Sequence, residues 1–220
     1  MAYREFVSLN HKSTKRDYLG RVTGRDKAEV AERAIQWGYD YWDGSRETGY
    51  GGYKYDGRWR KVADAMAETY AIKPGMRILD VGAAKGFLMH DFAEAVPGVE
   101  VQGLDISRYA IGHALDDMKD KIVEGSAARL PFPDNHFDLV VSITTLHNLY
   151  IYDLFPALRE MERVSRGARY LCVEAYRNER EKVNLMYWQL TCRAFHTPQE
   201  WEWIFAQAGY GGDYEFIYFE

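Results

Sequence analysis

Two aspartates end buried apolar runs of the sequence, and both are placed to bind a ligand. A carboxylate at Asp80 can accept a hydrogen bond from an ammonium group or a bound water, and it favours a positively charged ligand. Gly82 and Gly86 follow it, and glycines let the backbone turn sharply and approach a ligand closely. Asp105, 23 positions after Gly82, ends the next strand-like run, where a carboxylate can accept both hydroxyls of a ribose.

The same stretch argues against two common nucleotide-binding motifs. A dinucleotide fingerprint needs glycines at positions 82, 84 and 87, but Ala84 and Phe87 stand there. A P-loop would need Gly-Lys followed by Ser or Thr, which is also absent. NAD, FAD and nucleoside triphosphates bound through a P-loop are therefore disfavoured.

The elements that must position these residues alternate between strands and helices. We expect strands over 77–81, 99–105, 122–123, 137–143, 168–175 and 214–219, and helices over 59–70, 86–95, 107–118, 154–165 and 198–208. Strands that alternate with helices of ~10–15 residues predict right-handed βαβ crossovers and a parallel sheet covered on both faces. The fold class is therefore α/β, an open sandwich of Rossmann type, with an α-helical N-terminal extension.

Three further motifs continue this series: GSAARLPF at 125–132, FDLVVS at 137–142 and LHNL at 146–149. In this order they resemble the class I S-adenosylmethionine-dependent methyltransferases of the small-molecule "type 11" group. Typical motifs of that group are D-x-G-x-G-x-G, G-x-D, G-D-A-x-x-L-P-F and F-D-x-V-x-S. The resemblance runs from about residue 76 to the C-terminus. It implies a Rossmann-like methyltransferase sandwich and S-adenosylmethionine as the cofactor.

The resemblance also implies roles for individual residues in cofactor binding. Gly82 and Gly86 would shape the methionine pocket above Asp80, and Asp105 would bind the ribose. The other implied cofactor residues are Ala84, Ile106 on the adenine, Ser126 and Ala127 along the adenine edge, and Ser142 near the sulfonium. Two positions depart from the pattern: Ala84 replaces the middle glycine, and Ser126 stands where an aspartate is usual. After 214–219 no sequence remains for the usual seventh, antiparallel strand, so either that strand is lost or the strand count is off by one.

His147 and Asn148 follow the fourth predicted strand, on the side where the methyl group would emerge. An imidazole with an ordinary pKa near ~6.5 suits a general base, so His147 is a candidate base or substrate contact. The alternative is that His147 orients Asn148 or caps the helix at Asp153. His147 and Asn148 are therefore the candidate catalytic residues.

The N-terminal extension, residues 1–72, precedes a methyltransferase domain over 73–220. Its opening stretch, 1–27, holds seven Lys or Arg, and we expect an arm that is partly mobile or docks late. The stretch 37–59 is dense in tryptophan and tyrosine, and several of these aromatic residues are flanked by glycines. Such a segment predicts a lid over cofactor and acceptor, with packing of the extension onto the sheet as the alternative. The substrate-contact candidates here are Tyr50, Tyr53, Arg58 and Trp59.

An insertion near 180–197 separates the fifth predicted strand from the last helix. It is where the second wall of an acceptor pocket is expected, and its candidates are Tyr187, Arg193 and His196. Met186, Trp188 and Leu190 in the same stretch are better explained by packing.

Composition limits the remaining choices. The net charge is −5, and no apolar run is long enough for a membrane span. The two cysteines lie outside any metal-binding spacing. We therefore expect a cytoplasmic protein without a metal site. We expect methyl transfer to a small polar or anionic acceptor, at oxygen rather than nitrogen. The aromatic, glycine-rich stretch also resembles methyltransferases of polysaccharide and specialised-metabolite biosynthesis, which implies a place in such a pathway. The alternatives are an RNA methyltransferase that uses the basic arm and an inactive cofactor-binding scaffold. Nucleic acid and membrane are disfavoured as partners, and a homodimer is compatible with the sequence.

Overall fold

Six strands of the computed structural model form one sheet in which every neighbouring pair is parallel. The structure describes residues 1–12 and 16–220, and the strand order is β3-β2-β1-β4-β5-β6. The strands are β1 (Arg77–Val81), β2 (Glu100–Asp105), β3 (Ile122–Glu124), β4 (Phe137–Ile143), β5 (Ser165–Glu174) and β6 (Asp213–Ile217). The Rossmann-like parallel architecture predicted from the alternating elements is confirmed.

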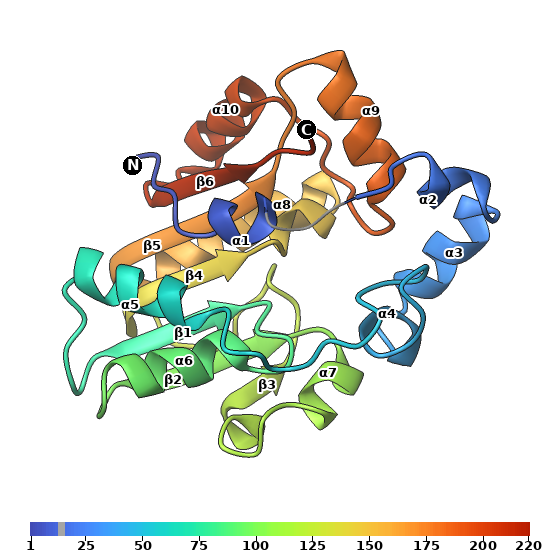
Figure 1. Ribbon diagram of the computed structural model, residues 1–220. Helices are drawn as coiled ribbons and strands as arrows, with labels where there is room; N and C mark the ends of the chain where they lie inside the picture. The colour runs from blue at the N-terminus through green and yellow to red at the C-terminus, as the bar shows by residue number, and fades with distance from the viewer. Residues whose placement is uncertain (13–15) are drawn as a thin grey trace.

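Ten α-helices and two 3-10 helices in the described chain connect and cover these strands (Figure 1). The N-terminal extension holds α1 (Ser8–Lys12), α2 (Gly20–Thr23), α3 (Lys27–Ala34), α4 (Tyr39–Trp42) and α5 (Arg60–Thr69). The rest are α6 (Phe87–Ala95), α7 (Arg108–Gly112), η1 (Lys119–Lys121), η2 (Leu146–Asn148), α8 (Ile151–Val164), α9 (Glu179–Trp188) and α10 (Pro198–Ala208). None of these described helices is long and apolar enough to cross a membrane.

The sheet buries a separate apolar core on each face. Helices α8 and α10 cover one face, where Leu158, Trp201 and Phe205 are fully buried. Helices α5 and α6 cover the other face with Met66 and Phe92, and α1 and α9 extend that core along the sheet. Burial of large side chains on both faces explains why the strands are almost continuously apolar. The carboxyl ends of the strands are left for α3 and α4, which lie beyond them in Figure 1.

The N-terminal arm is docked along the outer strand of the sheet. Ala2 and Arg4 form backbone hydrogen bonds with Tyr214 of β6, and the carboxylate of Glu215 accepts the backbone N–H groups of Phe6, Val7 and Ser8. The Glu215 side chain is fully buried, so it acts as a capping group for the first turn of α1. The described residues of the arm are therefore docked on the sheet, and its partial mobility or late docking stays a prediction. Lys15 and the side chain of Lys12 lie outside them.

Two further predictions differ from the structure, and one alternative that the sequence left open is decided by it. The helix expected over 107–118 ends at Gly112, and the chain then turns so that the Leu115 backbone N–H reaches the carbonyl of Lys85. Much of the insertion at 180–197 is helical, because α9 begins at an Asn178 cap and continues to Trp188. Within residues 1–12 and 16–220 the sheet ends at the parallel strand β6 without an antiparallel seventh strand.

Candidate active site

A cavity of about 260 Å³, here called the first cavity, opens at the carboxyl ends of β1, β2 and β4. Ligands of parallel α/β sheets bind at this edge, next to the point where the strand order reverses. Seven of the nine residues predicted to bind a cofactor line it: Asp80, Gly82, Ala84, Asp105, Ile106, Ser126 and Ala127. The strand-to-helix turns thus bring together residues that are far apart in the sequence.

Two carboxyl groups dominate the polar wall of the first cavity. Asp105 is held in place by the backbone N–H groups of Ala84 and Ser107, each at 2.7 Å from one of its oxygens. Asp80 is 4% exposed and receives no hydrogen bond from the described residues. Burial and the neighbouring charge of Asp105 raise the pKa of Asp80 to about 7. A buried acceptor without a donor is costly, so this wall fits a ligand that brings an ammonium or hydroxyl group.

The turn after β1 is shaped for close approach. Gly82 has φ of +90°, and a Cβ there would lie 2.0 Å from Oγ1 of Thr145. Only glycine fits such a position, and Ala84 adopts a positive φ that would suit the glycine of the usual motif better than alanine. Gly86 and Ser142 do not line the cavity: Gly86 packs against Met118, and the Ser142 hydroxyl donates to the carbonyl of Val81.

The aromatic segment of the extension forms a roof over the first cavity. The roof is made by Tyr41, Trp42, Tyr50, Tyr53 and Trp59. Tyr50 is stacked on Trp42 at 5.4 Å between ring centroids. Tyr53 is stacked on Phe87 at 4.8 Å, and Phe87 begins the helix after the glycine turn. The roof therefore rests on the same turn that carries Gly82 and Ala84.

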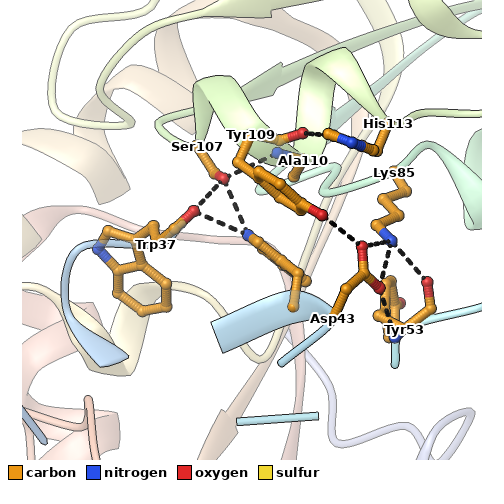
Figure 2. Close-up of polar contacts among 9 residues, drawn as sticks. Trp37, Asp43, Tyr53, Lys85, Ser107, Tyr109, Ala110 and His113 are labelled. Atoms are coloured by element: carbon orange, nitrogen blue, oxygen red, sulfur yellow. Dashed lines mark hydrogen bonds and ion pairs between the residues drawn. The ribbon is translucent and has the colours of Figure 1, made fainter. Parts of the chain in front are cut away.

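A buried ion pair fastens this roof to the domain below (Figure 2). The ammonium of Lys85, within the glycine turn, donates to both oxygens of Asp43 at 2.8 and 2.7 Å and to the carbonyl of Tyr53 at 2.9 Å. The hydroxyl of Tyr109 also donates to Asp43, at 3.0 Å. Burial alone would raise the pKa of Asp43, but these donors hold that pKa below its ordinary value. Lys85 is itself buried, so this cation depends on Asp43 for its stabilisation.

A second cavity of about 220 Å³ adjoins the first. The two share the wall residues Tyr41, Tyr50, Arg58, Trp59 and Thr144. The second cavity is also lined by the docked arm, by η2, by the end of β5 and by residues 188–191. Its charged groups are the four arginines Arg16, Arg21, Arg46 and Arg58 and a single carboxyl group, that of Glu174.

His147 and Glu174 form a buried pair at the floor of the second cavity. Nδ1 of His147 accepts the backbone N–H of Glu174 at 3.4 Å, so the ring proton lies on Nε2, which is 3.5 Å from Oε2 of Glu174. Gln189 donates to the other carboxyl oxygen, Oε1. Burial lowers the pKa of His147 to about 3 and raises the pKa of Glu174 to about 8. Both groups are therefore mostly neutral near pH 7, and His147 does not have the ordinary pKa assumed from the sequence.

The remaining candidates fall into two groups. Asn148 lines the first cavity, where its side chain donates to the carbonyl of Thr145 and accepts from the hydroxyl of Thr191. Tyr50, Tyr53, Arg58 and Trp59 line the first cavity as well.

Tyr187, Arg193 and His196 line neither of the two cavities. Arg193 lies over the ring of Tyr150, and His196 packs edge-on against Trp201. The insertion instead contributes Trp188 and residues 189–191 to the second cavity, because α9 turns Tyr187 outward.

The sequence reasoning missed several residues that build the two cavities. Glu174 was treated as part of a strand, although an acidic residue at the carboxyl end of a buried strand was the signal already used for Asp80 and Asp105. Lys85 was visible within the glycine turn, but its partner Asp43 lies 42 positions away. Arg21 and Arg46 had no local signal, since the fold alone brings them to the cavity.

Comparison with known proteins agrees with this arrangement. Residues 72–209 match the family model described as a methyltransferase domain. A demethylmenaquinone methyltransferase of Roseiflexus sp. is 31% identical over 74% of this chain and 67% of its own length. A ubiquinone/menaquinone biosynthesis C-methyltransferase of Burkholderia cenocepacia is 37% identical over 53% of this chain and 49% of its own.

Among solved structures, the YcgJ protein of Bacillus subtilis superposes with a TM-score of 0.56 and 25% identity, over 66% of each chain. The chain spans between 27% and 67% of the length of the first curated relatives that it matches.

Proposed function

The chain belongs to the methyltransferase domain family of S-adenosylmethionine-dependent enzymes, and we propose that its first cavity binds this cofactor while its second cavity binds the methyl acceptor. The observation that carries the proposal is the unpaired, buried carboxyl group of Asp80 beside the fixed carboxylate of Asp105, at the strand ends where a ligand is expected.

Each residue of the first cavity has a proposed task. Asp105 accepts the ribose hydroxyls, because its oxygens are already oriented by two backbone donors. Asp80 accepts the ammonium of the methionine part, which also compensates its burial. The adenine lies against Ile106, Ser126 and Ala127. Gly86 and Ser142 act from behind the wall by shaping the turn and holding the end of β1. When bound, the cofactor supplies a methyl group on a positively charged sulfur.

The task of the second cavity is to hold the acceptor and to exclude water. Alignment of the reacting atoms supplies much of the rate enhancement in such a displacement, so rigid walls matter. Tyr50, Arg58 and Trp59 belong to both cavities and therefore face cofactor and acceptor together. We propose a small polar or anionic acceptor, in keeping with the four arginines of the cavity.

We further propose methyl transfer to oxygen rather than nitrogen. The pKa of Glu174 is raised to about 8, so its ionised form can receive the proton of a hydroxyl, while the neutral His147 positions Glu174 and Asn148 keeps the loop after β4 in position. The names of two relatives specify carbon as the atom that those enzymes methylate, so carbon acceptors belong in any screen. Only the sequence resemblance of the aromatic, glycine-rich segment supports a place in polysaccharide or specialised-metabolite biosynthesis.

An RNA acceptor is less well supported by the docked arm. Arg4 pairs with Asp213, Arg21 donates to the carbonyls of Trp188 and Arg46, and Lys27 donates to the carbonyl of Tyr187. A phosphate-binding arm would present such cations to solvent instead.

Transfer of a labelled methyl group tests the proposed function. The full chain is incubated with methyl-labelled S-adenosylmethionine and a panel of hydroxy acids, sugar phosphates, amines, quinols and RNA. We expect label in a hydroxyl-bearing small acid and none in RNA. At a low concentration of S-adenosylmethionine, Asp105→Ala should strongly reduce labelling, whereas Glu100→Ala, at the exposed far end of the same strand, should retain it. A wild-type chain that binds S-adenosylhomocysteine but labels nothing would favour the scaffold alternative.

A further inference from the structure

We propose that the second cavity binds a small, ring-bearing hydroxy acid, with its carboxylate or phosphate at Arg21 and Arg46 and its hydroxyl at Glu174. The inference rests on the proposed function, because it specifies the class of acceptor that lies beside the cofactor cavity. It adds a location for the acid group and a direction for the molecule within the cavity.

The first argument concerns the donors that the arginines present to the cavity. Arg21 uses Nε and Nη1 to bind the carbonyls of Trp188 and Arg46, and its Nη2 donates to none of the described residues. Arg46 uses only Nη1, toward the carbonyls of Gly49 and Tyr50. No carboxylate of the described chain lies within ion-pair distance of Arg21 or Arg46, in contrast to Arg58, which is paired with Asp56. These guanidinium groups therefore retain N–H donors suited to the two oxygens of a carboxylate or phosphate.

The second argument is the crowding of positive charge. Arg21 and Arg46 lie 5.0 and 5.5 Å from the ring centroid of Trp188, so both contact one indole. Burial lowers the pKa of Arg21, and the charge of Arg46 lowers it further. Like charges held this close repel each other, and an anion between them would remove that repulsion. The nearby Glu47 offsets part of this repulsion, and a neutral acceptor would add nothing to that compensation.

The third argument gives the direction of the bound molecule. Glu174 is 3% exposed, and Oε2 receives no hydrogen bond from the described residues. A hydroxyl group of the ligand would satisfy this unpaired oxygen, whereas the N–H donors of Arg21 and Arg46 suit the acid group. The acid group is therefore assigned to Arg21 and Arg46, and the hydroxyl is assigned to Glu174.

The remaining walls favour a flat molecule. Aromatic surface of the cavity is supplied by Tyr41, Tyr50, Trp59, Trp188 and Phe219. Aromatic side chains stack on planar groups at little cost in conformational entropy. The second cavity, of about 220 Å³, is similar in size to the first and has room for a single substituted ring.

Calorimetry with matched ring compounds tests the inference on the full chain saturated with S-adenosylhomocysteine. The probes are 3-hydroxybenzoate and its neutral isostere 3-hydroxybenzamide, which differ in charge but hardly in shape. We expect the acid to bind at least about tenfold more tightly than the amide. Arg21→Met and, separately, Arg46→Met should reduce this preference about tenfold, whereas Arg25→Met should not, because Arg25 pairs with Glu47 outside the cavity.

Two further comparisons separate the parts of the inference. Comparing the affinities of benzoate and phenyl phosphate shows whether the cavity prefers a carboxylate or a phosphate as the acid group. Glu174→Gln should weaken the binding of 3-hydroxybenzoate more than the binding of benzoate, because only 3-hydroxybenzoate carries a hydroxyl group. Arg46 is exposed, so its variant should fold even if Arg21→Met does not.

Equal affinity for acid and amide in the wild type would overturn the inference, and so would an absence of binding by every acid at millimolar concentration. The acid titrations are repeated without S-adenosylhomocysteine. Failure of that nucleoside to bind therefore counts against the proposed function alone, and failure of the acids counts against this inference alone.

Discussion

The two adjoining cavities are built in opposite ways. The first lies on turns that directly follow β1, β2 and β4, and its polar wall is acidic through Asp80 and Asp105. The second is assembled from the arm, from residues 46–50 and from residues 188–191, and its lining is rich in arginine. One end of the site thus suits a cation and the other an anion.

One sheet can therefore carry a site that the fold itself determines, the first cavity, beside a site that depends on additional segments, the second cavity. Strand ends and a glycine turn are fixed by the sheet, so the first cavity follows from the fold itself. The second depends on segments that dock from distant parts of the chain. Variants of each cavity should therefore affect one ligand and leave the other largely unchanged.

The largest effect is expected at the buried ion pair that fastens the roof. Asp43→Asn leaves the ammonium of Lys85 buried without a counterion, which should cost about 3–5 kcal/mol in the free energy of unfolding. The double variant Asp43→Asn with Lys85→Met removes both charges and should recover part of that loss. Chemical denaturation of the three proteins measures this. A single variant as stable as the wild type would show that the roof is not held by this pair.

A smaller effect is expected for the carboxylate that faces the ribose position. Asp105→Ala should weaken binding of S-adenosylhomocysteine by roughly 1–3 kcal/mol, because hydrogen bonds to a charged group are lost. The preference of the second cavity for an acid over an amide should persist in this variant. Calorimetry gives both numbers, and loss of the acid preference as well would contradict the independence of the two cavities.

The unpaired aspartate of the first cavity predicts a dependence on pH. The pKa of Asp80 in the folded chain is raised to about 7, so the stability of the empty protein falls from about pH 4, where the unfolded chain loses this proton, to about pH 7 and changes little above it. A bound ammonium favours the ionised form, and affinity for S-adenosylhomocysteine should therefore increase about tenfold between about pH 6 and pH 8. In Asp80→Asn the affinity should stay nearly constant. A flat profile in the wild type would remove Asp80 from the ammonium site.

No change of protonation is expected at His147, the histidine of the second cavity, which makes this the smallest predicted effect. Burial lowers the pKa of His147 to about 3, so its ring should remain neutral from about pH 5 to pH 8. Nitrogen chemical shifts of the ring report this directly, with the exposed residue His113 as an internal comparison. Titration of His147 near an ordinary histidine pKa of about 6.5 would restore it as a base.

An element of this fold is predictable from the sequence when the residues that determine it lie close together in the chain. Strand β4 was predicted with its observed bounds, and α10 too, because Thr197, Pro198 and Gly209 mark its ends within a few residues. Helix α9 was missed since Glu181 and Leu185 are its only buried side chains, which leaves no apolar stripe to detect.

The same rule holds for the site. The residues of the first cavity sit on short motifs, and seven of the nine residues predicted to bind a cofactor lie at its wall. Arg21 and Trp188 of the second cavity are 167 positions apart and carry no pattern in common. Docking of distant segments depends on packing that no local window of sequence contains.

Amide chemical shifts of the full chain during titration with S-adenosylhomocysteine test the central assignment most directly. Saturable changes concentrated at residues 80–86, 105–107 and 125–127, with little change at 188–191, are the predicted result. An unresponsive spectrum, or changes centred on the arginine-rich cavity, would contradict it.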